Sequence, residues 1–593
     1  MTVSNKVYSL THSQKTLTAA FAASPTSSPG YLAKTLYAEH HKKPISSGGY
    51  LETFMGVLQH GSASETQRIP SGEPTQADLD RAAECGNFGS RPSDLFLKIY
   101  CDVLATLDTN PWAGVVSPPL LGSRGVVNLS IISVIPDIIQ HHYDCIVRAE
   151  SEVFLATNFW QASKSASKIC DALLELSRRA TKRGKKVVVK MMYDRANLKM
   201  LTESHIIVDD AEMASDEVKL PKRSDMPGID FELVNFHQPV FGTFHCKFMI
   251  VDRKMALLNS NNIQDRPNME MMIHLEGPIV DSLYDTALVS WFRPMHPPLP
   301  LLNTGYRPPK GGYKFGMNNE YATTWILDGS KGAELFKTLQ QEAGGIHDET
   351  GIKEERKILP LLDLQMQGIP YEPPASSRDE YTPHILHTRH GECPMVLVNR
   401  APNGSPGNPA IPVVEGILNA VRRGIECTLY IDVGFNDGGE ALPGQGGTNE
   451  EVSKTMFAQL TDEEKEKLKL YWYTGKDQIK PVNASAQKRN CHVKLMTIDD
   501  SVGIVGNGNQ DTQSWYHSQE VNVMVDNPTV CQEWFDGVRR NQNTHLHEVE
   551  KDGIYRDKDG NPLTDSTGVG SGFRGVVKGI QGSIARVRGK GGF

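Results

Sequence analysis

Several features that would assign this chain of 593 residues to a broad class are absent. No apolar run approaches the roughly 18 residues that a membrane-spanning helix requires. The nine cysteines, scattered from Cys85 to Cys531, form no CxxC pair, which suggests neither a zinc motif nor a disulfide framework and favours a reducing compartment. Basic residues are not in excess either: 62 Lys and Arg against 70 Asp and Glu give a net charge of −8, unlike most proteins that coat DNA. A hydrophobic content of 39% is enough for a core, which excludes wholesale disorder.

Both ends of the chain have an unusual charge pattern. Residues 1–38 contain no Asp, Glu or Arg and are rich in Ser and Thr, so they only partly resemble a transit peptide. We therefore expect a cytoplasmic protein, with organellar targeting as the alternative. Residues 573–593 carry five basic residues and no acidic one, with apolar residues at helical spacing. This pattern predicts a basic segment that binds an anionic membrane peripherally, or else a disordered solubilising tail.

Two regions of the chain follow the same plan. Apolar residues recur at helical spacing over 169–176, a glycine at 184 ends the pattern, and the apolar run 187–193 predicts a buried strand. The same order recurs in the helical pattern 413–421, Gly424 and the strand pattern 425–433. A helix followed by a strand, repeated, indicates an α/β fold built from parallel units.

A second likeness follows each of these units. Residues 245–252 (HCKFMIVD) and 492–499 (HVKLMTID) both fit H-x-K-x-x-x-x-D. Each continues into a second apolar run that ends in a small polar string, Asn259-Ser260-Asn261-Asn262 or Gly506-Asn507-Gly508-Asn509. A glutamate follows each string, Glu270 and Glu520. The chain therefore contains two diverged halves of one architecture.

The spacing within each motif predicts where its side chains point. Residues two apart in a strand face the same side, so each His should project together with its Lys from an otherwise apolar strand. Asp252 and Asp499 lie at an odd offset in sequences typical of hairpin turns. We expect them to hold the turn or a lysine rather than to touch the reacting group.

The converging residues fit the chemistry of a phosphodiester. Lysines neutralise non-bridging oxygens and asparagines donate to them. One histidine can attack phosphorus while the other protonates the departing alcohol, and a glutamate on Nδ1 would fix each ring's tautomer. Because the lysines supply positive charge, and the motifs contain no cluster of carboxylates, we expect neither a metal nor a cofactor.

These residues resemble the signature of the phospholipase D superfamily, over roughly residues 125–545. The resemblance implies two α/β/α sandwich domains related by a pseudo-twofold axis, with one shared active site and a phosphohistidine intermediate. By resemblance His245 is the nucleophile and His492 the general acid, then base; Lys247, Lys494, Asn262 and Asn509 bind phosphate. The usual G-S-x-N string is altered at Asn259 and Asn507, which changes fine phosphate contacts. The predicted catalytic residues are His245, Lys247, Asp252, Glu270, His492, Lys494, Asp499 and Glu520, and the predicted substrate-binding residues are Ser260, Asn262, Asn507, Asn509 and Trp515.

The same features predict a domain plan. We expect a mostly helical extension (1–120), a first catalytic domain (121–340), a linker (341–380), a second catalytic domain (381–550) and a Gly-rich basic tail (551–593).

Among phosphodiesters, a phospholipid is favoured as the substrate over nucleic acid. The chain carries two complete motifs, its tail suits a membrane, and the aromatic residues around Trp515 either line a lipid channel or pack against the sandwich. The leading hypothesis is a phospholipase D-type hydrolase of glycerophospholipids with some transphosphatidylation. The alternatives are a phosphatidyltransferase of the cardiolipin or phosphatidylserine synthase type, a nuclease, and an inactive membrane scaffold.

Overall fold

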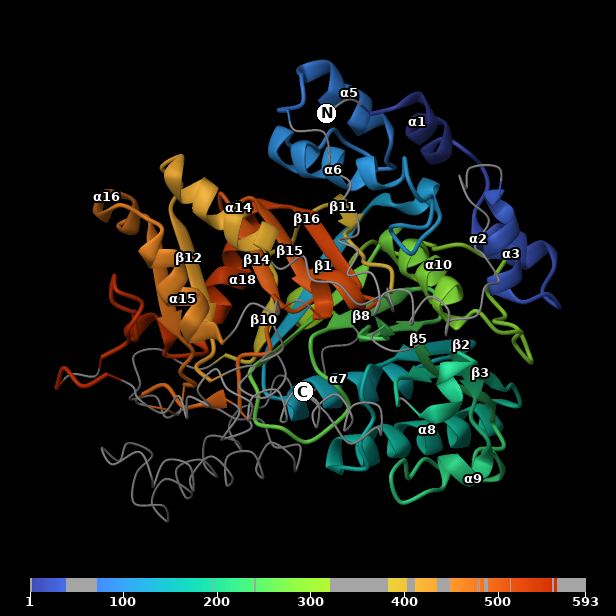
Figure 1. Cartoon of the computed structure of the whole chain (residues 1–593). Helices are drawn as coiled ribbons and strands as arrows, with labels where there is room; N and C mark the ends of the chain where they lie inside the picture. Colours follow the sequence, from blue (N-terminus) through green and yellow to red (C-terminus); the bar gives the residue numbers. More distant parts are fainter. Residues whose placement is uncertain are drawn as a thin grey trace, which may run out of the picture.

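The computed structural model describes residues 3–38, 72–319 (except 196 and 239–241), 382–402, 411–434 and 448–562 (except 477, 479, 485–488, 512 and 557–558). Within these ranges the protein is a mixed α/β fold, as predicted (Figure 1). No helix in the described ranges is both long and apolar enough to cross a bilayer. The predicted linker and the basic segment 573–593 lie outside them, and the predicted domain boundaries remain predictions.

One long strand joins the two halves of the chain. Strand β1 (Gly122–Ser133) pairs antiparallel with β11 (Cys393–Leu397) through its first residues, and with β9 (Glu270–Glu276) through the rest. Strands from both halves therefore belong to one 14-stranded sheet, whose main path is β14-β15-β16-β11-β1-β9-β8-β7-β2-β3-β5-β4.

The first repeated unit forms as the sequence predicts. Helix α8 (Lys164–Arg183) begins at the N-cap Ser163 and ends at Gly184, whose φ of 68° suits glycine. It connects the parallel strands β2 (Glu152–Ala156) and β3 (Val187–Tyr193), and β3 pairs in parallel with β5 (Ile229–Gln238).

The second unit forms too, but in a different place. Helix α14 (Ile411–Arg422) leads into β12 (Cys427–Ile431), which pairs in parallel with β13 (Leu468–Trp472). These two strands form a separate sheet with their own hydrophobic cluster. Helices α15 (Asn449–Ala458) and α16 (Asp462–Lys465) lie between them in the chain.

Each H-x-K motif is followed by an antiparallel meander. In the first half it comprises β7 (Phe248–Val251), β8 (Met255–Asn259) and β9. In the second half it comprises β14 (Leu495–Ile498), β15 (Val502–Gly506) and β16 (Asn522–Asp526). In each half, the hairpin formed by the first two strands of the meander turns through two residues with positive φ. These are Asp252-Arg253 in the first half and Asp499-Asp500 in the second. The predicted hairpin turns are therefore present.

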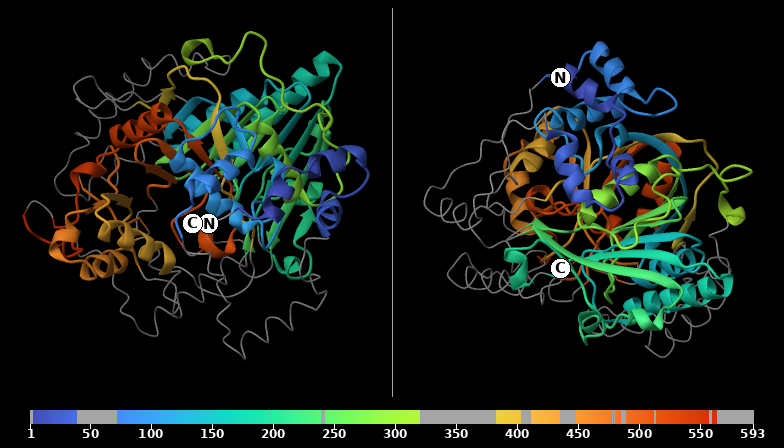
Figure 2. Two further views of the ribbon diagram at one scale, coloured as in Figure 1. Left: turned by 90° about the horizontal axis from the view of Figure 1, so that it is seen from above. Right: turned by 90° about the vertical axis from the view of Figure 1, so that its right-hand side faces the viewer.

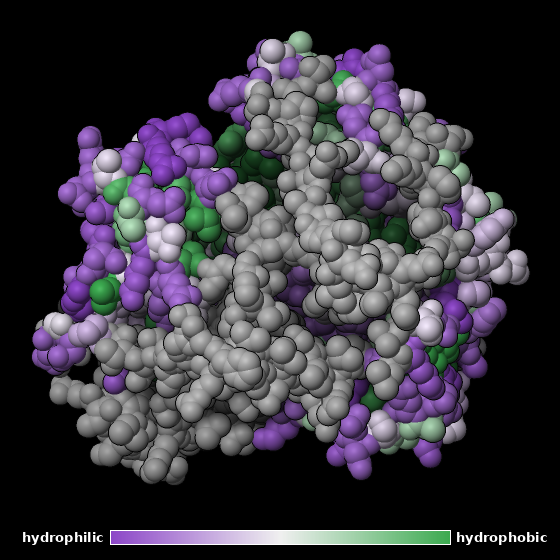
Figure 3. Space-filling model, viewed as in Figure 1, coloured by the Kyte–Doolittle hydropathy of each residue, from purple (hydrophilic) through white to green (hydrophobic). Residues whose placement is uncertain are grey.

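Helices cover both faces of the sheet (Figure 2). Helix α7 (Ile135–Ile146) and α8 share one hydrophobic cluster with the sheet, while α10 (Ile279–Trp291) and N-terminal helices pack in another. The described surface in Figure 3 is mainly hydrophilic. The other helices and strands are α1 (Asn5–Thr11), α2 (Leu17–Ala23), α3 (Pro29–Leu36), α5 (Gln76–Glu84), α6 (Asp94–Thr106), α9 (Asp210–Met213), α18 (Pro528–Arg540), β4 (His205–Ile207), β6 (Gly242–Thr243) and β10 (His384–Leu386).

Candidate active site

The sequence predicted that each H-x-K segment lies within a strand. In the structure, each segment instead lies just before its hairpin, outside the regular strands. Strand β7 begins at Phe248 and β14 at Leu495, one residue after each lysine. The reason is that the backbone before each strand pairs with the other half. The N–H of His245 donates to the carbonyl of Gln519 (3.1 Å), and the N–H of His492 to the carbonyl of Met269 (2.7 Å). The two motifs are thereby held side by side.

Each histidine is hydrogen-bonded to the glutamate of the other half. Nδ1 of His245 lies 2.9 Å from Oε2 of Glu520, and Nδ1 of His492 lies 2.8 Å from Oε2 of Glu270. All four side chains are buried. Because a carboxylate accepts, each Nδ1 carries the proton, and Nε2 is the basic nitrogen of the neutral ring. The sequence predicted that these glutamates orient histidines, but not that they are exchanged between the halves.

The motif lysines fold back toward their own histidines. Nζ of Lys247 donates to the carbonyl of His245, and Nζ of Lys494 to the carbonyl of His492, both at 2.7 Å. Burial lowers the pKa of Lys247 to about 7 and that of Lys494 to about 8, against the opposing charges of Glu520 and Glu270. A phosphate anion bound beside them would raise both pKa values again.

The histidines are neutral in the free site. Burial lowers the pKa of His492 to about 4 and also lowers the pKa of His245, although the partner glutamates oppose this. Lys247 and Lys494 both act on each histidine, so the charges of the two motifs belong to one electrostatic site. A neutral imidazole is the form that can attack phosphorus.

The small polar strings have mixed roles. Ser260 donates to Oε2 of Glu270 at 2.5 Å and accepts from the N–H of Met271, so it supports the glutamate. Nδ2 of Asn507 donates to the carbonyls of Lys247 (3.0 Å) and Asn259 (2.6 Å). The structure thus engages Ser260 and Asn507, both predicted to bind substrate, in holding the site together.

The remaining two asparagines are placed differently. Oδ1 of Asn262 accepts from the N–H of Phe159 at 3.3 Å. The amide oxygen is therefore engaged, and Nδ2 is the group that can donate to a substrate. Asn509 is half-buried, and its backbone N–H donates to Oγ of Ser514. Phosphate binding by these two residues stays a prediction.

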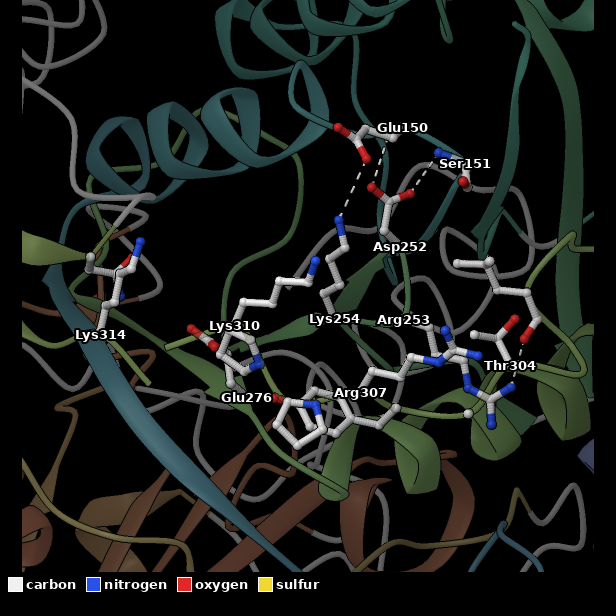
Figure 4. Close-up of a pocket in the computed structure, with 16 residues that line it drawn as sticks. Glu150, Ser151, Asp252, Arg253, Lys254, Glu276, Thr304, Arg307, Lys310 and Lys314 are labelled. Atoms are coloured by element: carbon white, nitrogen blue, oxygen red, sulfur yellow. Dashed lines mark hydrogen bonds and ion pairs between the residues drawn. The ribbon is translucent and has the colours of Figure 1, made fainter. Parts of the chain in front are cut away.

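The aspartates of the two motifs are not equivalent. The carboxylate of Asp252 accepts from the backbone N–H groups of Glu150, Ser151 and Glu152 at 2.7–2.9 Å. Asp499 is exposed. A cavity of about 570 Å³ beside Asp252 (Figure 4) has neither motif's His or Lys in its lining. It lies at the opposite end of β7 from His245. Both aspartates, included among the predicted catalytic residues, are therefore turn residues, as the odd offset predicted.

Trp515 lies in a π-helical turn, Gln513–His517, directly after the second polar string. It is half-buried, and its Nε1 donates to Oε1 of Gln510 at 3.2 Å. The neighbouring Tyr516 accepts at its carbonyl from the guanidinium of Arg400. Trp515 therefore stays a candidate for substrate contact rather than a core residue.

Sequence reasoning missed two aspartates at corresponding positions. Asp194 follows β3, and its Oδ2 accepts from the N–H of Phe244, the residue before His245 (2.8 Å). Asp432 follows β12, and its Oδ1 accepts from the N–H of Cys491, the residue before His492 (2.8 Å). An aspartate directly after the strand of each repeat was the available signal. Both fix the backbone that presents a histidine.

The exchanged His–Glu pairs join the two motifs into one site built by two halves of one chain. Residues 408–539, which include the second motif, match the family model described as "Cardiolipin synthase, PLD-like domain". With the duplicated motif, this match supports the resemblance to the phospholipase D superfamily.

Comparison with whole proteins adds two findings. A search of curated proteins gives no match. Among solved structures, phosphatidylserine synthase of Haemophilus influenzae Rd KW20 aligns with 79% of this chain and 96% of its own, at 11% identity and a TM-score of 0.40.

Proposed function

We propose that the chain transfers phosphatidyl groups between alcohols, as a phosphatidyltransferase of the cardiolipin or phosphatidylserine synthase type. The observation that carries the proposal is the pair of buried His–Glu hydrogen bonds exchanged between halves beside Lys247 and Lys494. The cardiolipin synthase description of the matched family supports transfer over the hydrolysis that the sequence alone favoured.

The reaction follows from the protonation of the two rings. Nε2 of His245, the nucleophile by resemblance, attacks phosphorus, and the headgroup oxygen leaves with a proton from Nε2 of His492. The phosphatidyl group stays on His245. The acceptor hydroxyl then gives its proton to His492 while its oxygen attacks phosphorus and frees His245. The bound phosphodiester is an anion, so it raises the pKa of His492 and lets that ring hold the second proton.

The other polar groups stabilise charge rather than move protons. The lysines of both motifs and the amide of Asn262 would donate to the non-bridging oxygens, whose charge grows in the transition state. Water as the acceptor would yield phosphatidate by the same route, which is the phospholipase D reaction. The acceptor alone separates the two activities.

The test is an acceptor competition. The full chain is incubated in EDTA with labelled phosphatidylglycerol or phosphatidylcholine, with and without ethanol, and with single-stranded DNA. A cardiolipin-like product or phosphatidylethanol supports transfer. Phosphatidate alone, even with abundant alcohol, would make the protein a hydrolase. Cleavage of DNA alone would make it a nuclease, and inactivity on every substrate would favour a scaffold. The His245→Ala, His492→Ala double variant is the control for contaminating activity.

We further propose that residues 573–593 bring the enzyme to an anionic membrane. Their five basic residues contrast with the net charge of −8, and a basic residue near such a surface contributes about 1 kcal/mol. The full chain should sediment with phosphatidylserine vesicles and not with phosphatidylcholine vesicles. Replacing the five basic residues by Ala should abolish this difference; unchanged binding would contradict the proposal.

A further inference from the structure

Three potential metal ligands lie together outside the phosphodiester site. His141 and Cys145, one turn apart on α7, face His274 of β9, and all three side chains are buried. Their ligand atoms lie within 4.8 Å of one another, with Nε2 of His141 only 3.1 Å from Nδ1 of His274. Two ligands of a tetrahedral zinc, each about 2.1 Å from the ion, lie roughly 3.4 Å apart, close to this spacing.

The donor atoms of the cluster suit a cation. Two imidazole nitrogens face each other, and a thiol sulfur lies within 4.8 Å of both. Without an ion, two facing imidazole nitrogens share a single hydrogen. Nitrogen and sulfur donors are the set that zinc prefers over calcium or magnesium.

A carboxylate lies close to the ring of His274, as carboxylates do around most zinc-binding histidines. Nε2 of His274, the nitrogen not facing His141, lies 3.7 Å from Oε1 of Glu276. Asp137 is fully buried one turn before His141 on α7. Oδ1 of Asp137 and Nδ1 of His141 are buried without a hydrogen-bond partner among the described residues. Coordination through Nε2 would place a proton on that Nδ1, one helical turn from a carboxylate acceptor.

We propose that His141, Cys145 and His274 bind a zinc ion. His384 of β10, a strand that pairs with β1 as β9 does, is a candidate for the fourth position. Binding ionises the buried thiol of Cys145 and releases one proton per ion. The site is separate from phosphate chemistry and holds whether or not the proposed function is correct.

The position of the ion gives it a structural purpose. It would tie α7 to β9, and β9 begins at Glu270, the partner of His492. Glu270 and His274 point to the same face of β9, because they are an even number of residues apart. A metal at His274 would thus stiffen the strand that carries the glutamate.

Metal content provides the first test. The untagged full chain is unfolded, freed of metal and refolded with Zn²⁺, and bound zinc is measured by mass spectrometry after gel filtration. We expect close to one ion per chain, and close to none for Cys145→Ser and His274→Gln. The matched control is Cys170→Ser on α8, a buried cysteine hydrogen-bonded to the carbonyl of Lys219, which should keep its ion. A wild-type chain that refolds but binds no zinc would overturn the proposal. So would a Cys145→Ser variant that binds one zinc ion per chain.

Binding of Co²⁺ gives a second measurement, which remains informative even if a variant misfolds. Co²⁺ bound through Cys145 should produce a thiolate-to-metal charge-transfer band in wild-type protein and in Cys170→Ser, with release of one proton. If circular dichroism shows that Cys145→Ser has not refolded, the wild-type Co²⁺ spectrum alone tests the proposal. A folded wild-type chain that binds Co²⁺ without that band has no cysteine ligand, and the proposal fails.

Discussion

The same H-x-K-x-x-x-x-D motif occupies two unlike surroundings in the two halves. In the first half every residue of β7 and β8 is buried, and Lys247 is fully buried. In the second half β14 contains an exposed Met496 and no fully buried residue, and Lys494 is half-buried. Asp252 accepts three backbone N–H groups, whereas Asp499 faces solvent.

This difference separates what the site requires from what each hairpin requires. The His–Glu bond, the Lys-to-carbonyl bond and the aspartate that holds the preceding amide occur in both halves. The buried aspartate of the turn occurs only in the first. We therefore expect variants of the shared contacts to affect catalysis in both halves, and variants of the turn to affect stability in one.

The largest effects are expected from His245→Ala and His492→Ala. Each alone should lower kcat by roughly 10³-fold or more, and the double variant should be little worse, because residues that act as a unit are not additive. The measurement is single-turnover transfer from labelled phosphatidylglycerol, with the exposed His12→Ala as the control. Retention of near-full activity by either variant would mean that the halves do not share a site.

A smaller loss, on the order of 10²-fold in kcat, is expected for Glu270→Gln and Glu520→Gln, because each weakens control of a tautomer. The comparison is sharpened by trapping the covalent intermediate in acid. Glu520→Gln should slow its formation on His245, while Glu270→Gln should slow both formation and breakdown through His492. The opposite pattern would reverse the assignment of nucleophile and acid.

The lysines should give the two halves different pH limits. A lysine is charged below its pKa, so Lys247 loses its charge as pH rises through about 7 and Lys494 through about 8. The value of kcat/KM should therefore fall by about a further tenfold per pH unit above the first value, and by about another tenfold per pH unit above the second, in addition to any dependence on His492. Lys247→Arg should remove the first limb and Lys494→Arg the second. An unchanged profile in both variants would assign the limbs to other groups.

The smallest effect is one of stability. Asp252→Asn removes the charged acceptor of three backbone N–H groups and should cost roughly 2 kcal/mol of unfolding free energy. Asp499→Asn, at an exposed turn with similar positive φ, should stay within about 0.5 kcal/mol of the wild type. Urea unfolding followed by circular dichroism measures both. Equal losses would show that the turns are equivalent after all.

Most of the site could be predicted from local patterns in the sequence. The helix that ends at Gly184, the strand after it, the hairpin turns and the His, Lys and Glu set all follow from short-range spacing. The exchange of glutamates does not, because each pair is separated by 275 or 222 residues and either pairing satisfies the same chemistry. The contacts of Asn507 were hidden for the same reason, since its acceptors lie in the other half.

The metal cluster illustrates the same limit. His141 and Cys145 on an amphipathic helix indicate little by themselves, because a buried histidine or cysteine is usually a packing residue. His274 is 133 residues away from His141 in the chain, so no linear motif links them. Folding alone brings them together.

The exchanged glutamates also bear on assembly. Glu520 completes the first half and Glu270 the second, so an isolated half would carry a histidine and a carboxylate that each lack a partner. Activity therefore requires that the two halves of the chain are docked against each other. Two fragments expressed from separate genes should be inert alone, and complementation in one cell should restore both histidines at the same moment.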